Sequence, residues 1–230
     1  EVSNMIKSTN GNVEIEVNRG GITKTLTLKV STVSIKSVVK NKYDKTGYLR
    51  IETFSNTTYK QFKESLETLE KEGIENLIVD VRNNGGGFLN SAVEIAELFV
   101  EKGKPIYGLQ TKDKKEMYKD TTKEKRDYKV IVLINGGSAS ASEVLAAALK
   151  ESYGATLLGT KSYGKGTVQD TSELESGGMI KYTTAYWLTP KGVTINEKGL
   201  TPDIEVTGSF KDGMTLENDV ELQTAINNLK

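Results

Sequence analysis

Residues 76–89 read NLIVDVRNNGGGFL, an apolar strand that runs into an acidic–basic pair and then into three glycines. Glycines allow the tight turn that a strand needs before a helix packs back onto its sheet. A helix is expected next, at residues 90–101. Further along, residues 128–135 repeat the apolar strand and residues 143–151 the helix. This alternation of buried strands and helices predicts an α/β fold with layers of sheet and helix.

Other segments extend the pattern. Residues 57–72 predict an amphipathic helix, because Phe62, Leu66 and Leu69 share one face. Further strands and a terminal helix are expected at residues 48–53, 155–159, 179–188, 203–206 and 219–229. The apolar face of that last helix is expected to pack either in the core or against a second copy of the chain, so a homodimer is one of the expected possibilities. Residues 103–126 are polar and uneven, which predicts a surface loop.

Composition excludes several classes of chemistry. The 230 residues include no histidine and no cysteine, so a Ser-His-Asp triad, a thiol nucleophile and a thiolate zinc site are excluded. No cofactor or metal is expected. The 31 basic residues balance the 31 acidic residues, so the net charge does not attract nucleic acid, and nucleic acid is not an expected partner.

Two glycine-rich segments precede helices. In residues 80–89, backbone N–H groups at the start of a helix could bind an oxyanion or a phosphate. The alternative is that the glycines only form a tight turn between strand and helix. In residues 135–143, NGGSASASE, Ser140 is either an exposed nucleophile or a helix cap that Glu143 completes. Either segment alone leaves both interpretations open.

A third glycine-rich segment supplies a candidate base. Residues 159–169 read GTKSYGKGTVQ and isolate Lys165 between two glycines. A serine nucleophile in a chain without histidine needs a lysine, a carboxylate or a terminal amine to accept its proton. The segment nearly spells a phosphate loop, but Gly166 stands where that loop needs Ser or Thr. Nucleotide binding is therefore not expected.

Taken together, the three segments resemble the carboxy-terminal processing peptidases, or tail-specific proteases, a serine–lysine family. The matching motifs are DVRNNGGG at residues 80–87, GSASASE at 137–143 and GKGTVQ at 164–169, in the order and spacing of the family. Similar stretches also occur at residues 46–55 and 185–206. The resemblance implies a crotonase/Clp-like layered protease core and a serine endopeptidase that cleaves near the C-termini of proteins.

The resemblance also implies roles for individual residues. Ser140 would be the nucleophile, Lys165 the general base and Gln169 the residue that holds the lysine amine. The oxyanion hole would be formed by backbone N–H groups of Gly86 or Gly87 and of Ala141. Glu143 would be a supporting acid. A lysine with an ordinary pKa of about 10.4 is almost fully protonated at neutral pH and cannot accept a proton. We therefore expect Lys165 to be buried, with Gly164 and Gly166 allowing close packing around it.

The resemblance divides the chain in two. Residues 1–38 would be the C-terminal part of a truncated PDZ-like domain, with a helix at residues 1–7 and closing strands, and residues 39–230 the catalytic core. Expected partners are proteins or peptides with apolar C-terminal tails. The expected location is outside the cytoplasmic membrane, at the cell surface, in the periplasm or secreted.

Two alternatives remain from the sequence. One is a non-catalytic peptide-binding relative with the same fold, which the partial N-terminal segment favours. The other is a crotonase-like acyl-thioester enzyme, which also uses paired backbone amides as an oxyanion hole. A shared layered fold cannot separate these classes, because similar frameworks host unrelated chemistry.

Overall fold

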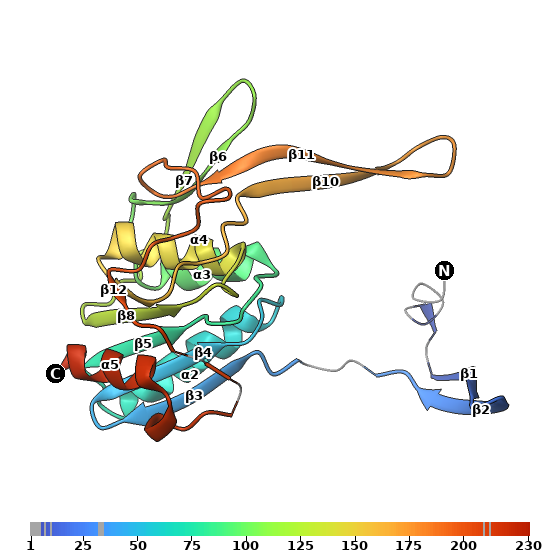
Figure 1. Ribbon diagram of the computed structural model, residues 1–230, viewed down its shortest axis with the longest axis horizontal. Coiled ribbons are helices and arrows are strands. Elements are labelled where there is room, and N and C mark those ends of the chain that lie inside the picture. Colours follow the sequence, from blue (N-terminus) through green and yellow to red (C-terminus); the bar gives the residue numbers. More distant parts are fainter. Residues whose placement is uncertain (1–5, 7, 10, 32–34, 209, 212) are drawn as a thin grey trace. The chain divides into compact units, whose positions relative to one another are not determined.

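The computed structural model describes residues 6, 8, 9, 11–31, 35–208, 210–211 and 213–230 (Figure 1). The chain forms two units, Glu1–Ile35 and Lys36–Lys230. The division lies three residues before the expected boundary at residue 38, because β3 (Val38–Tyr43) already belongs to the sheet of the second unit.

The first unit contains an antiparallel hairpin of β1 (Asn12–Arg19) and β2 (Ile22–Lys29). Gly20 and Gly21 form its two-residue turn with φ of 61° and 80°, as a twisted hairpin requires. The expected pair of strands is therefore present. The helix expected at residues 1–7 falls almost entirely outside the described residues, and membership of a PDZ-like domain stays a prediction.

The second unit is built on a six-stranded sheet. Its four inner strands are parallel to one another, and β3 is an antiparallel edge strand. In spatial order the strands are β12 (Ile204–Glu205), β9 (Thr156–Gly159), β8 (Lys129–Ile134), β5 (Asn76–Asp80), β4 (Thr46–Ile51) and β3. The expected α/β layering is confirmed.

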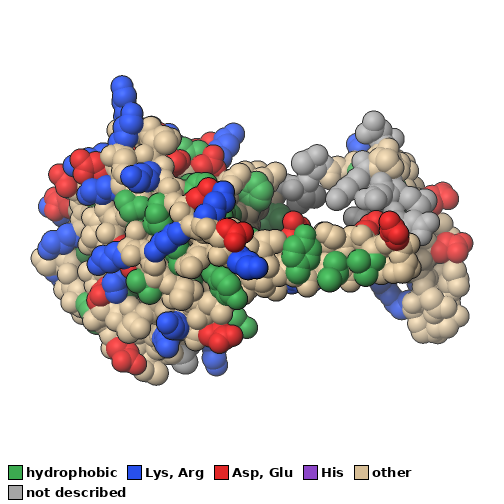
Figure 2. All heavy atoms as spheres, turned by 90° about the horizontal axis from the view of Figure 1, so that it is seen from above, with side chains coloured by type: hydrophobic (Ala, Val, Ile, Leu, Met, Phe, Trp, Pro, Cys, Tyr) green, Lys and Arg blue, Asp and Glu red, His purple; other side chains and the backbone are tan. Residues whose placement is uncertain are grey.

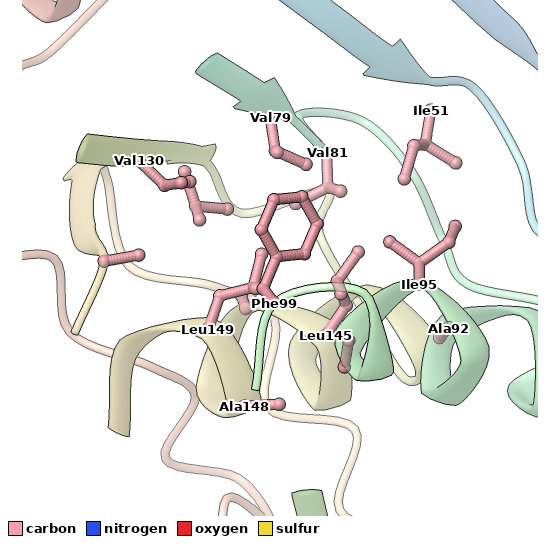
Figure 3. Close-up of a cluster of buried hydrophobic side chains, with 14 of the residues drawn as sticks. Ile51, Val79, Val81, Ala92, Ile95, Phe99, Val130, Leu145, Ala148 and Leu149 are labelled. Atoms are coloured by element: carbon pink, nitrogen blue, oxygen red, sulfur yellow. The ribbon is translucent and has the colours of Figure 1, made fainter. Parts of the chain in front are cut away.

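Helices cover both faces of this sheet. The larger core lies under α2 (Thr58–Lys71), α3 (Leu89–Glu97), α4 (Ala141–Ala148) and the π-helical turn η1 (Leu149–Tyr153). Figure 3 shows part of it, with Val79 and Val81 facing Ile95 and Leu145 and with Phe99 among them. Successive strand residues point to opposite faces, so Ile78 belongs to the other core.

The second core lies under the terminal helix α5 (Val220–Leu229), which the short 3₁₀ turn η2 (Leu216–Asn218) precedes. Leu222, Ala225 and Leu229 are buried against the sheet. These three residues of α5 therefore pack in the chain's own core, whereas Val220 is 56% exposed. A homodimer stays a prediction. No helix in the described part of the chain is long and apolar enough to cross a membrane.

A second, antiparallel sheet has the order β10-β11-β6-β7. Its strands are β6 (Pro105–Gln110), β7 (Lys115–Lys119), β10 (Thr167–Glu173) and β11 (Met179–Leu188). The prediction of a loop at residues 103–126 is wrong, because β6 and β7 pair there. The error has a physical reason: β7 is almost wholly exposed and lacks the apolar alternation that marks a strand.

The β10–β11 hairpin extends beyond this sheet as an arm (Figure 1). Its side chains are exposed along most of both strands. Hydrophobic side chains are visible along the arm (Figure 2), and the exposed ones include Leu174, Met179, Ile180 and Tyr182. The arm begins two residues after Lys165, so it is attached directly to the candidate site.

Candidate active site

Two of the glycine-rich segments meet because β5 and β8 are neighbouring parallel strands. The carboxyl ends of parallel strands lie at the same edge of a sheet, which places the loops after them side by side. Asn83 and Asn135 bind each other twice: the Asn83 N–H donates to Asn135 Oδ1 and Asn135 Nδ2 donates to Asn83 Oδ1, both at 2.9 Å. The Ala139 N–H also donates to the Asn84 carbonyl at 3.0 Å.

The serines on either side of Ser140 hold these loops together. Ser138 Oγ donates to the Val81 carbonyl at 2.7 Å, and Ser142 Oγ donates to the Asn84 carbonyl at 2.8 Å. Both serines are buried. Their hydroxyls are therefore structural, which leaves Ser140 as the candidate nucleophile of the segment.

Ser140 occupies an unusual backbone conformation. It precedes the first residue of α4 with φ 57° and ψ −118°, a region that non-glycine residues rarely adopt. Such strain costs of the order of 1–3 kcal/mol and persists where the surroundings impose it, often at functional sites. Ser140 is half-buried at the N-terminal, positive end of a helix, where negative charge is stabilised.

Gly86 lies directly against the nucleophile segment. A Cβ atom at Gly86 would come within 2.7 Å of the Ala139 carbonyl oxygen and 2.8 Å of Ser140 Cβ. The Gly86 N–H donates to Asn84 Oδ1 at 2.9 Å. Among the described residues, the N–H groups of Gly87 and Ala141 have no hydrogen-bond acceptor. Gly86 and Ala141 therefore lie next to Ser140, whereas a Cβ atom at Gly87 would meet the Phe54 backbone. The oxyanion role of Gly86, Gly87 and Ala141 stays a prediction.

Glu143 connects the serine segment to the lysine segment. Its fully buried carboxylate accepts from the backbone N–H of Ser140 at 3.0 Å and of Lys165 at 2.9 Å through Oε2. Through Oε1 it accepts from Ser162 Oγ at 2.6 Å and the Gly164 N–H at 2.8 Å. One carboxylate therefore satisfies four donors from two loops, and charge-assisted bonds of this kind are about twice as strong as neutral ones.

Lys165 lies on the exposed side of its loop, so the expectation that its side chain is buried is wrong in this structure. The flanking glycines have a different role. A Cβ atom at Gly164 would come within 2.8 Å of the Gly199 N atom, and one at Gly166 within 2.4 Å of Asn196 Cα. They let the backbone pack against residues 196–199 and do not enclose the amine.

Gln169 is also exposed, on β10 just after an irregularity in its pairing with β11. Within the described ranges, no hydrogen bond joins the side chains of Ser140, Lys165 and Gln169. The structure therefore brings the backbones of Ser140 and Lys165 together through Glu143 without a side-chain dyad. The predicted roles of these three residues stay predictions.

A cavity of about 790 Å³ lies beside this arrangement. Its lining combines both glycine-rich loops, the lysine segment and two exposed aromatic rings, and includes Gly137, Ala139, Lys165, Tyr163 and Tyr186. The lining also includes the polar side chains of Thr167, Asn196 and Glu197, so the cavity offers both aromatic and polar groups to a ligand. No group of three or more acidic side chains in the described part of the chain is arranged to hold a metal ion.

Sequence reasoning missed several residues that order the site. Asn84 Oδ1 accepts a hydrogen bond from the Gly86 N–H, and Asn84 Nδ2 donates to the Ile51 carbonyl at 2.8 Å. Ser162 bridges Glu143 and the Leu200 N–H, which donates to Ser162 Oγ at 2.7 Å. The only sequence signal was that polar residues stand beside glycines. Their partners are distant in sequence and could not be read from it.

Replacing Gly86 by alanine is expected to disrupt the site. The φ of 99° and the contacts of a Cβ atom predict a loss of unfolding free energy of about 2–4 kcal/mol. A shift of Ser140 by part of an ångström should also lower any catalytic rate about 10²-fold. Gly85→Ala is the matched control, because a Cβ atom there meets nothing within 4 Å and its unfolding free energy should change by less than about 0.5 kcal/mol. Equal thermal unfolding of both variants would contradict this packing.

Comparison with known proteins places the chain among proteases. The sequence model of peptidase family S41 matches residues 45–206. A "probable CtpA-like serine protease" of Staphylococcus epidermidis is 39% identical over 211 residues, which cover 90% of this chain and 43% of that protein. A protein of the same description from Staphylococcus saprophyticus is 39% identical over 197 residues, covering 84% and 40%. The chain thus spans about two fifths of the length of these curated relatives.

A solved structure supports the same grouping. The photosystem II D1 C-terminal processing protease matches with a TM-score of 0.70 and 30% identity, over 86% of this chain and 56% of that one. A second structure, described as a "putative peptidase" from Parabacteroides merdae, matches with a TM-score of 0.69 at 23% identity and shows the shared fold.

Proposed function

The chain belongs to peptidase family S41, and on that basis we propose that it is a serine endopeptidase that hydrolyses peptide bonds near the C-termini of protein substrates. Ser140 acts as nucleophile and Lys165 as general base. The observation that carries this proposal is the buried Glu143 carboxylate, which binds the backbone N–H groups of both residues.

In the proposed reaction, Ser140 Oγ attacks the peptide carbonyl carbon while neutral Lys165 Nζ takes the hydroxyl proton. The carbonyl oxygen becomes an oxyanion, which the N–H groups of Ala141 and Gly87 bind, since the Gly86 N–H already donates to Asn84 Oδ1. The Lys165 ammonium then returns the proton to the leaving amine, the C–N bond breaks, and an acyl-enzyme remains. A water molecule repeats the attack, with Lys165 as base, and releases the new carboxylate and Ser140.

The exposure of the Lys165 side chain in the free chain is compatible with its proposed role as base. An amine surrounded by water holds its proton, whereas loss of that water favours the neutral amine. Because Lys165 lines the cavity, a polypeptide in the cavity covers it. Substrate binding would therefore exclude water from Lys165, and we propose that it acts as the base in that bound state.

The substrate is proposed to be an extended polypeptide with an apolar C-terminal tail. Tyr163 and Tyr186, with 68% and 44% of their surface exposed, present aromatic faces to the cavity. The strand β10 is an edge strand that begins beside Lys165, so its outer backbone groups are free to pair with an added strand. We also propose, from the family relationship, that the reaction takes place outside the cytoplasmic membrane.

The second candidate is a peptide-binding relative without catalysis. The strained backbone of Ser140 fits either candidate, since such strain occurs at ligand-binding sites as well as at active sites. Cleavage separates the two candidates. The acyl-thioester alternative has no support from the family comparison.

The proposal is tested by incubating the chain with an unfolded protein that ends in an apolar tail and locating the cuts by mass spectrometry. We expect fragments that lack the C-terminal tail, and much slower cleavage when the tail is replaced by aspartates. Binding of the apolar tail without any cleavage would favour the binding relative.

A further inference from the structure

Arg82 has a fully buried guanidinium whose donors are all engaged by carboxylates. It binds Asp80 through Nε at 3.0 Å and Nη2 at 2.5 Å. It also binds Asp219 through Nη1 at 2.9 Å and Nη2 at 2.7 Å, and Glu221 through Nη1 at 2.6 Å. The Phe210 ring lies over the guanidinium, 3.9 Å from Cζ.

These bonds join two distant parts of the chain. Arg82 immediately precedes residues 83–87, the glycine-rich loop that contacts Ser140. Asp219 and Glu221 lie at the start of the terminal helix α5, and Asp219 also caps that helix by accepting the Leu222 N–H at 3.0 Å. The glycine-rich loop is therefore held on one side by α5 and on the other by the Ser140 segment.

The charges of this cluster are unbalanced, with three carboxylates around one guanidinium. Burial raises the pKa of Glu221, although its bonds to Arg82 act in the opposite direction. Burial also lowers the pKa of Arg82, but its bonds to Asp219 and Asp80 outweigh this and hold the pKa above its usual value. Apolar side chains of similar volume often stabilise a fold as well as buried ions do. The cluster therefore suggests a need for defined geometry beyond stability.

We propose that Asp219 and Glu221 are positioning residues for the reaction: they hold Arg82, and through it residues 83–87, in the geometry that the oxyanion loop needs. This proposal rests on the proposed function. The first link is from α5 to Arg82 through Glu221. Two residues further along the chain, the Asn84 carbonyl accepts from the Ala139 N–H and from Ser142 Oγ. Gly86, in the same loop, lies against Ser140. Asp219 and Glu221 contact no reacting atom.

The test compares Asp219→Asn and Glu221→Gln with Glu217→Gln, an exposed control one turn away on η2. Each variant keeps nearly the same volume and changes only the charge and hydrogen bonding. We expect kcat for an apolar-tailed peptide to fall about 10- to 100-fold in the two test variants, with KM changed less than about twofold. Glu221→Asp should recover part of the loss, and Glu217→Gln should behave as wild type.

Rates are counted per folded molecule, from thermal unfolding of each variant, so that a lost fold is not mistaken for a lost geometry. Lower unfolding temperatures with unchanged kcat per folded molecule would overturn the proposal, since the cluster would then be structural only. Amide hydrogen exchange of residues 83–87 gives a readout that does not depend on catalysis. We expect faster exchange there in Asp219→Asn than in Glu217→Gln, and equal exchange would also overturn the proposal. A wild-type chain without activity but with this exchange difference would contradict the proposed function alone.

Discussion

Replacing Ser140 by alanine should lower the rate of peptide cleavage by at least about 10⁴-fold, with the fold unchanged. The reason is that Ser140 supplies the oxygen that attacks, and neither cysteine nor histidine is present to replace it. The backbone conformation is as strained for alanine as for serine, so the substitution should not relax the loop. The rate is measured on a peptide with an apolar tail, beside thermal unfolding of the same sample.

The matched control is Ser176→Ala, in the exposed turn of the β10–β11 arm. It removes the same hydroxyl far along the arm and should leave both rate and unfolding temperature as in wild type. Equal residual cleavage by wild type and Ser140→Ala would identify another nucleophile or a contaminating protease.

Replacing Lys165 by alanine should lower kcat by about 10²- to 10⁴-fold, the usual contribution of a positioned proton acceptor. The chain has no histidine, and Lys165 is the lysine whose backbone the Glu143 carboxylate holds beside the Ser140 segment. Because the side chain is exposed, its removal should leave the unfolding temperature nearly unchanged. Loss of activity without loss of stability separates a base from a structural lysine.

Lys161→Ala is the control for this result. Lys161 is exposed in the same glycine-rich segment, but it does not line the cavity beside Ser140. Its variant should keep the wild-type rate. If Lys161→Ala and Lys165→Ala lost activity equally, the effect would belong to the positive charge of the segment and Lys165 would not be the base.

Both predictions concern a site whose backbone is held by buried hydrogen bonds, while the side chains of Lys165 and Gln169 are exposed. The buried contacts of Glu143, Ser138 and Ser142 set the positions of the loops. The Lys165 and Gln169 side chains remain exposed. Preorganised backbone donors give most of the stabilisation of an oxyanion, whereas a proton acceptor can be oriented when substrate binds.

The sequence predicted the core well and the second sheet less well. Strands such as β5 and β8 carry unbroken apolar runs, because helices cover both faces of a parallel sheet. The strand β7 is almost wholly exposed, and β3 is an edge strand with three exposed residues. Such strands are stabilised by backbone pairing with neighbours, which leaves little trace in the pattern of side chains.

By itself, the sequence determined the α/β class, the absence of histidine and cysteine chemistry, and the three glycine-rich segments that carry the candidate site. These follow from residue type and local spacing, since glycine permits turns and apolar periodicity marks burial. Only the tertiary structure decided that Glu143 bonds both segments, that Arg82 is held by α5, and that Lys165 is exposed. These depend on which distant groups meet, and hydrogen bonds and burial are set by that packing and not by local sequence.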